Sequence, residues 1–231
     1  RVLSYWETMP FWTTFWRALG FKIQLSDLST RKIYEDGLSA VTSDTVCFPA
    51  KLVHGHLRNL VKKGVDRIFM PSITTVTSEN TESTSESMCA IVKGYPIVIR
   101  NSDNPEKRWH IPFDAPLFHW YKREDRNRQL TGYMEKTFGI SPAETRQAIN
   151  VADAAEKQFH DEMHRAGKAV LDEVTANGSY AVILASRPYQ NDALVNHDLP
   201  EMFTSLGIAD GRFSGRSRPC GFEHEPTGYC Q

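Results

Sequence analysis

The feature that most constrains the fold is an alternation of short β-like runs with amphipathic helical segments. Residues 21–25 alternate apolar and polar side chains, as a half-buried strand does, and residues 65–70 form a second β-like run. Helical spacing of apolar residues predicts a helix over 10–19, another that ends near Gly37 and a third that begins near Pro49. Because helices connect parallel strands, this order predicts an α/β fold with a layered, mainly parallel sheet.

The segment Ser43–Gly64 (SDTVCFPAKLVHGHLRNLVKKG) places a cysteine just before a helix. Pro49 suits the first helical turn, because its missing N–H would have no partner there. Cys47 is therefore expected at the positive end of a helix dipole, an environment that lowers the pKa of a thiol and favours metal binding or redox chemistry. The polar stripe of this helix is expected to carry Lys51, His54, Arg58 and Lys62.

A second cysteine follows a long polar segment. Residues 74–87 lack any apolar period and predict an exposed loop, which ends at Met88 and Cys89 before an apolar run resumes. Open α/β sheets bind ligands at the carboxyl ends of their strands. We therefore expect Cys89 to meet Cys47 at that edge.

The second half of the chain predicts longer helices. A charged helix is expected over 124–138, and Ser141 with Glu144 forms a capping-box pattern for a helix that runs to about residue 176. A buried-type strand is expected over 180–185.

Arg187 and Tyr189 follow that strand at its carboxyl end, where a ligand would bind. Together with Lys51 they are candidate ligand-binding residues. The alternatives are a rigid turn set by Pro188 and an ordinary solvated lysine.

These patterns predict four parts: an α/β domain over 1–122 that carries both cysteine loops, a helical connector over 123–177, the start of a second α/β unit over 178–209 and an irregular tail over 210–231. The chain begins at Arg1, inside what looks like a strand, which indicates a piece of a longer protein.

Composition narrows the possible partners. The chain has 231 residues, a formal net charge of −1 and 40% hydrophobic residues, so neither nucleic acid nor a membrane is an expected partner. Four cysteines in a chain of this length do not form a secreted disulfide framework, which favours the cytoplasm. No phosphate-binding loop of the Walker A or GxGxxG type is present, so ATP hydrolysis is not encoded in this chain.

Other metal-capable residues have structural alternatives. His54 and His56 are candidate ligands or hydrogen-bonded structural histidines. His160 and His164 have the spacing of a helical metal site, without the glutamate that HExxH proteins carry. The tail carries a further group of possible metal ligands, Cys220, His224 and Cys230. Their spacing matches no known zinc-binding motif.

Several longer segments resemble one known family. They are PFWTTFWRALGF, SDTVCFPAKLVHGHLRNLVKKGVDRIFMP, MCAIVKGYP, ASRPYQND and LPEMFTSLG, which together span roughly residues 1–209. The chain resembles the acyl-CoA dehydratase activase-associated domain family, which is similar to 2-hydroxyacyl-CoA dehydratase subunits and double-cubane-cluster reductases. The resemblance implies flavodoxin-like or Rossmann-like layers and a [4Fe–4S] cluster, with Cys47 at the first ligand position and Cys89 at the second. It also implies at least one further ligand, expected after the point where this chain stops.

The resemblance implies an electron-transfer module that works with an ATP-dependent iron–sulfur activator, as part of a dehydratase, a reductase or the activator itself. An acyl-CoA or another small molecule would be the substrate. The alternatives are a non-catalytic docking or regulatory domain and a thiol redox switch between Cys47 and Cys89. Four positions depart from the family pattern, namely Ala90, Ser186, Gln190 and Ala193. Of these, Ala90, Ser186 and Ala193 favour the docking domain.

Overall fold

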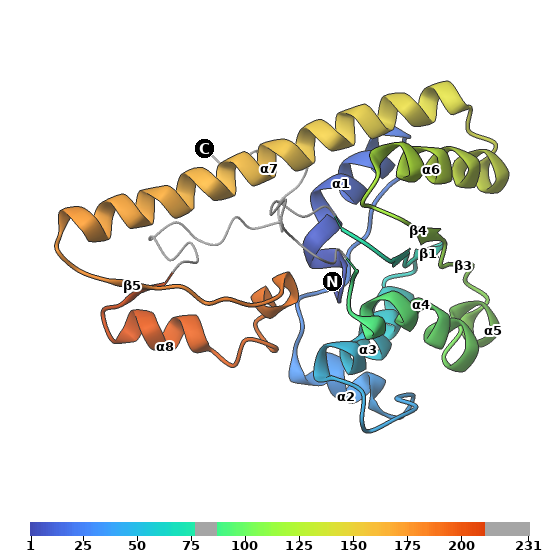
Figure 1. The fold of residues 1–231 in the computed structure, drawn as a ribbon. Coiled ribbons are helices and arrows are strands. Elements are labelled where there is room, and N and C mark those ends of the chain that lie inside the picture. The colour runs from blue at the N-terminus through green and yellow to red at the C-terminus, as the bar shows by residue number, and fades with distance from the viewer. Residues whose placement is uncertain (77–86, 211–231) are drawn as a thin grey trace. The chain divides into compact units, whose positions relative to one another are not determined.

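The fold was described from a computed structural model, which covers residues 1–76 and 87–210 (Figure 1). The chain divides into two compact units. The first comprises Arg1–Glu156 and Pro188–Val195, and the second comprises Lys157–Arg187 with the described residues from Asn196 onward. No helix in the described ranges is both long enough and apolar enough to span a bilayer.

The first unit combines helices with a short parallel ladder. Its helices are α1 (Tyr5–Ala18), α2 (Arg31–Leu38), α3 (Phe48–Lys62), α4 (Ala90–Ser102), α5 (Pro105–Trp109), α6 (Arg123–Phe138), the 3₁₀ turn η1 (Pro188–Asn191) and the first part of α7 (Pro142–Ala176). Strand β1 (Ile68–Phe69) pairs in parallel with β3 (Phe113–Asp114), and β2 (Ser72–Ile73) pairs in parallel with β4 (Leu117–Phe118). These pairs confirm the α/β class.

The two strand pairs form one ladder that prolines interrupt. Backbone hydrogen bonds continue between them, with Met70 N–H donating to the Asp114 carbonyl at 2.8 Å and Ser72 N–H to the Pro116 carbonyl at 2.8 Å. Pro71 and Pro116 lie between the paired segments and have no N–H to donate, which explains why each strand is short. The second β-like run predicted from the sequence is therefore present, but it is split and extends to residue 73.

Aromatic side chains fill the core of this unit. Phe11 and Phe15 of α1 are fully buried and stack with ring centroids 5.7 Å apart. Trp12 and Trp16 lie beside them, as the helical spacing predicts. Their ring centroids lie 4.7 and 5.0 Å from the ring centroid of Phe69. The packing of α1 against the parallel ladder is thus an aromatic interface.

Two strand predictions at the start of the chain are wrong. Residues 1–4 form a turn into α1, which begins at Tyr5 rather than at Pro10. Residues 21–30 have no regular structure. Phe21 and Ile23 alternate with polar residues because both pack on the aromatic core, but no strand pairs with this segment.

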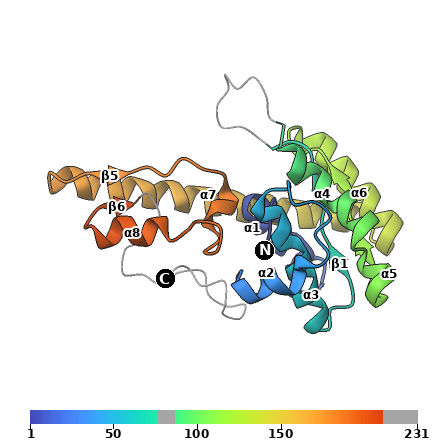
Figure 2. The same ribbon diagram turned by 90° about the horizontal axis from the view of Figure 1, so that it is seen from below.

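Helix α2 packs very closely against α3, and both views show the two side by side (Figure 1 and Figure 2). A Cβ atom added at Gly55 would lie 1.8 Å from the carbonyl oxygen of Ile33, and one added at Gly37 would lie 2.2 Å from the Gly55 nitrogen. Glycine at both positions therefore lets the two helix backbones touch, and Gly55 separates His54 from His56.

The capping box predicted for α7 is confirmed. Glu144 N–H donates to Ser141 Oγ at 3.3 Å, and Ser141 N–H donates to Glu144 Oε2 at 3.1 Å. The helix then continues to Ala176 and is shared by the two units, with the division after Glu156. Besides the end of α7, the second unit contains α8 (Leu199–Ser205) and a parallel pair of β5 (Ala181–Val182) with β6 (Ala209–Asp210).

Candidate functional site

Cys47 is the residue that precedes α3. Its backbone is extended, with φ −62° and ψ 153°, and its carbonyl accepts hydrogen bonds from Ala50 and Lys51 at 3.1 and 3.3 Å. The thiol makes no capping hydrogen bond, is exposed and belongs to no disulfide. The sulfur is therefore accessible at the positive end of the helix dipole.

Cys89 occupies the equivalent position at the start of α4. It is exposed, belongs to no disulfide and makes no side-chain capping bond. The preceding residue, Met88, is buried, and its N–H donates to the Thr74 carbonyl at 3.0 Å. This bond fixes Cys89 close to the carboxyl end of β2, where the sequence predicted a ligand-binding edge.

Contacts taken in chain order show that α3 and α4 run in the same direction. In the first half of α3, the Nε2 atom of His54 lies 3.0 Å from the hydroxyl of Tyr95, which belongs to the first half of α4. Further along α3, Arg58 bonds Asp103 at the end of α4 and stacks over Trp109 of α5. Both cysteines therefore lie at the same end of this helix pair.

A lysine follows each cysteine by four residues. Lys51 Nζ donates to the Asp44 carbonyl at 2.9 Å, and Lys93 Nζ donates to Ser87 Oγ at 2.8 Å. Both ammonium groups thus lean back toward the start of their helix, where they add to the positive potential of the two helix dipoles. Lys51 was predicted as a site residue from the sequence, and Lys93 was missed.

A buried polar network joins α3, α4 and α5. The Nδ1 atom of His54 lies 2.7 Å from Asp103 Oδ2, and its Nε2 atom lies 3.0 Å from the hydroxyl of Tyr95. Asp103 also binds Arg58 at 2.8 Å and Arg108 at 2.8 Å. Burial alone would raise the pKa of Asp103, but hydrogen bonds from His54 and Arg58 outweigh it and hold this pKa below its ordinary value.

A second network lies around His56. Its Nδ1 atom is 2.8 Å from Ser26 Oγ, and its Nε2 atom is 3.0 Å from Ser29 Oγ. Ser29 donates its hydroxyl hydrogen to the carboxylate of Asp192, which lies in the same unit just after η1. Burial lowers the pKa of His56 to about 3, so this imidazole is neutral near pH 7.

These networks decide the role of the two histidines on α3. Both ring nitrogens of each histidine have protein partners, which leaves no nitrogen lone pair for a metal ion. Both His54 and His56 are therefore hydrogen-bonded structural histidines rather than metal ligands. The prediction that His54 belongs to the polar stripe is wrong, because its side chain is fully buried against α4.

The other predicted residues lie elsewhere. Tyr189 belongs to η1, which packs on α1, whereas Arg187 belongs to the second unit. His160 and His164 are exposed on the part of α7 in the second unit. The cluster of Cys220, His224 and Cys230 lies outside the described residues. The structure therefore gathers Cys47, Cys89 and Lys51 at one end of a helix pair, and it does not gather the remaining candidates with them.

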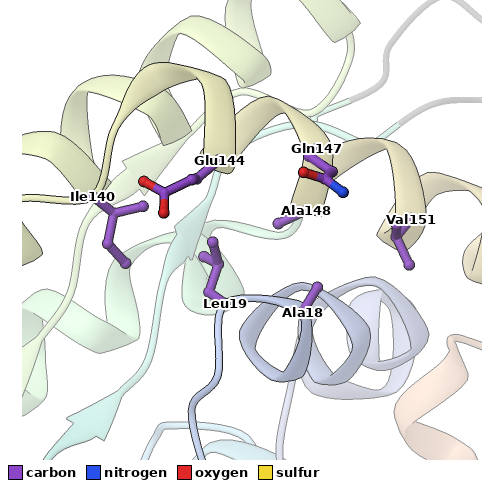
Figure 3. Close-up of a pocket in the computed structure, with 7 residues that line it drawn as sticks. All are labelled: Ala18, Leu19, Ile140, Glu144, Gln147, Ala148 and Val151. Atoms are coloured by element: carbon purple, nitrogen blue, oxygen red, sulfur yellow. The ribbon is translucent and has the colours of Figure 1, made fainter.

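A cavity of about 320 Å³ lies in the first unit between the end of α1 and the start of α7 (Figure 3). Ala18, Leu19 and Ala148 form part of its lining, and Glu144 is the acidic residue there. Glu144 already serves the capping box with Ser141, so its carboxylate is used by the helix start. This cavity holds none of the predicted site residues.

Sequence reasoning missed the residues that support α3. Tyr95, Asp103, Ser26, Ser29 and Asp192 are all buried and polar, and they come from segments far apart in the chain. The available signal was the pair His54 and His56 on opposite sides of Gly55, because two residues apart on a helix point in different directions.

A comparison with protein-family models identifies one family for this chain. The family model described as "CoA enzyme activase uncharacterised domain" matches residues 1–210. Neither the curated proteins nor the solved structures contain a significant match. The matched range includes both cysteine-bearing helices, both buried networks and the described part of the second unit. The chain therefore belongs to the family of CoA enzyme activase uncharacterised domains.

Proposed function

We propose that this domain is an iron–sulfur electron-transfer module, related to 2-hydroxyacyl-CoA dehydratase subunits, that works with an ATP-dependent iron–sulfur activator. The observation that carries the proposal is the placement of Cys47 and Cys89, two exposed thiols at the N-termini of two helices with the same direction. Family membership supports a role with an activator of CoA-linked enzymes. The parallel strands support a flavodoxin-like layered sheet as the setting.

The donor set fits part of a cluster site. Iron–sulfur clusters are held by cysteine thiolates, and an electropositive surrounding favours the thiolate form. Cys47 and Cys89 would supply two ligands, with Lys51 and the helix dipoles stabilising the negative charge. Within residues 1–76 and 87–210, no group of three or more His, Cys, Asp or Glu side chains could hold a metal ion. The remaining ligands would therefore come from elsewhere in the protein or from a partner.

In the proposed step, one electron enters from the activator and one electron leaves to a partner subunit or to a substrate such as an acyl-CoA. Lys51, Arg187 and Tyr189 remain the proposed ligand-binding residues. The first of these lies at the cysteine end of α3, where an acyl-CoA phosphate would meet positive charge. A reducing cytoplasm is the setting in which free thiolates would persist.

The test is electron acceptance in the longest form of the protein that contains this domain. After anaerobic reconstitution with iron and sulfide, we expect absorbance near ~400 nm that bleaches when the activator and ATP are added. Cys47→Ser and Cys89→Ser should each abolish the bleaching. An Asp125→Asn variant, which removes a surface carboxylate that pairs with Arg128, is the control and should behave like the parent.

A docking or regulatory domain is the second candidate. It is favoured by the limited donor set, since the described residues offer two exposed thiols and two fully hydrogen-bonded histidines. In that case the domain would bind the activator with unchanged affinity in both serine variants, and no bleaching would occur in any form. Affinity measured alongside absorbance separates the two functions.

A further inference from the structure

The contact between α3 and α4 contains a carboxylate that water does not reach. Asp103 has no exposed surface and receives hydrogen bonds or ion pairs from His54, Arg58 and Arg108. Tyr95 joins the network through its hydroxyl, which bonds the other ring nitrogen of His54. The buried polar groups of His54, Tyr95 and Asp103 therefore all have partners across the contact between α3 and α4.

The proton positions in this chain follow from the chemistry of its ends. An ionised carboxylate only accepts hydrogen bonds, so His54 Nδ1 carries the hydrogen that lies toward Asp103. The Nε2 atom of His54 forms the second hydrogen bond of the ring, with the Tyr95 hydroxyl at 3.0 Å. The order Tyr95, His54, Asp103 is thus a continuous chain of hydrogen bonds.

Such a chain of hydrogen bonds fixes the alignment of α3 with α4 more than it adds to the free energy of unfolding. Replacing a buried ion pair with well-packed apolar residues is often neutral or stabilising, whereas removing one partner is strongly destabilising. Polar contacts of this kind hold two helices in one alignment, because any other alignment leaves a buried group without its partner. An apolar contact would permit sliding that this network forbids.

We propose that the chain of Tyr95, His54 and Asp103, together with Arg58, is a positioning device that sets the spacing of Cys47 and Cys89. This inference rests on the proposed function for its purpose, since a shared ligand needs both sulfurs at a fixed distance. His54 follows Cys47 by seven residues, about 10 Å of helix, and Tyr95 follows Cys89 by six, about 9 Å. A slip of one residue between the helices would move one sulfur by about 1.5 Å relative to the other.

The test measures the spacing of the two sulfurs in iron-free protein. The background is Cys220→Ser with Cys230→Ser, which leaves Cys47 and Cys89 as the only thiols among the four cysteines of the chain. Bismaleimides with spacers of increasing length are applied, and intramolecular cross-links are counted by mass spectrometry. We expect a preference for one spacer length in the background protein and loss of that preference in Asp103→Asn. Single alkylation by N-ethylmaleimide should proceed at the same rate in both.

Milder and control variants keep the test decisive. Tyr95→Phe removes one hydroxyl from the chain and should weaken the spacer preference, and it remains informative even if Asp103→Asn does not fold. Asp125→Asn removes a surface carboxylate that pairs with Arg128 and should leave the preference unchanged. If Asp103→Asn and Tyr95→Phe lower the melting temperature but keep the background preference, the network is only structural and the proposal is overturned.

The outcomes also separate this inference from the proposed function. A spacer preference that depends on Asp103, in a protein that never takes up iron, supports the positioning device and contradicts the electron-transfer role. Iron uptake by the parent, with an unchanged spacer preference in Asp103→Asn and Tyr95→Phe, supports the electron-transfer role and contradicts the positioning device. A background protein with no spacer preference at all overturns the positioning device, because the two sulfurs would then have no fixed separation.

Discussion

His54 Nδ1 lies 2.7 Å from Asp103 Oδ2, although 49 residues separate the two along the chain. The contact joins the helix that follows one exposed cysteine to the end of the helix that follows the other. His56, two residues further on, turns to a different partner set and connects α3 to Ser29 and Asp192. Helix α3 is therefore held by a polar network on each side.

Removal of the Asp103 carboxylate should strongly destabilise the first unit. Asp103→Ala leaves the Nδ1 hydrogen of His54 and the guanidinium of Arg58 without their acceptor inside the protein. We expect the free energy of unfolding to fall by about 3 kcal/mol, since breaking a buried pair on one side costs about this much. Urea denaturation followed by circular dichroism measures it. A loss below about 1 kcal/mol would show that water replaces the carboxylate readily.

Gly55→Ala should separate α2 from α3. The new Cβ atom would lie 1.8 Å from the Ile33 carbonyl oxygen, so the helices must move apart. We expect a loss of at least about 2 kcal/mol in the free energy of unfolding, comparable with overpacking of a core. The matched control is Gly132→Ala on α6, where a Cβ meets nothing within 4 Å. That change should raise stability by up to about 1 kcal/mol, because alanine favours helix. Equal effects of the two substitutions would contradict the close contact.

His56 should make stability depend on pH in a defined window. Its pKa is lowered from 6.5 to about 3 in the folded protein, mainly by burial. Between these values the unfolded chain binds more protons than the folded chain, so the free energy of unfolding falls as the pH falls from about 6.5 to 3. The contribution of His56 is at most about 1.4 kcal/mol per pH unit.

Urea melts at several pH values measure this slope. His56→Gln should reduce it, whereas His164→Gln, which alters an exposed histidine of α7, should leave it unchanged. Identical slopes in the parent and His56→Gln would mean that the imidazole is protonated inside the folded protein.

Asp192 should hold the segment Pro188–Val195 on the first unit. Its carboxylate accepts the Ser29 hydroxyl hydrogen, and its Oδ1 atom accepts the Leu194 N–H at 2.9 Å. Asp192→Ala removes both acceptors, and we expect faster amide hydrogen exchange in this segment with little change in α6. Exchange followed by mass spectrometry tests it. Unchanged protection of residues 188–195 would show that the contact of η1 with α1 is sufficient to hold them.

The sequence predicted elements whose signals are local. The capping box of Ser141 and Glu144 lies within four residues, and the boundaries of α3 follow from Pro49 and Gly64. The apolar run after Cys89 did not indicate a helix, because it is rich in β-branched residues and contains Pro96 inside α4. Phe21 and Ile23 showed strand-like alternation without a strand, since burial against aromatic rings produces the same pattern as pairing.

The support of the site could not be predicted in the same way. Periodicity assigns His54 to a polar stripe, and only the packing of α4 shows that this histidine is buried. Asp103 and Asp192 are 49 and 136 residues from the histidines whose networks they join, so no local pattern connects them. The positions of the two exposed cysteines can be read from the sequence, because one precedes Pro49 and the other follows the long polar segment.

The most direct measurement of the central claim is the iron and acid-labile sulfide content per chain after anaerobic reconstitution of the longest form of the protein. A shared cluster predicts iron and sulfide in equal amounts in the parent, and loss of both in Cys47→Ser and in Cys89→Ser alike. Iron and sulfide that persist unchanged in either variant, or a parent protein that takes up neither, would contradict it.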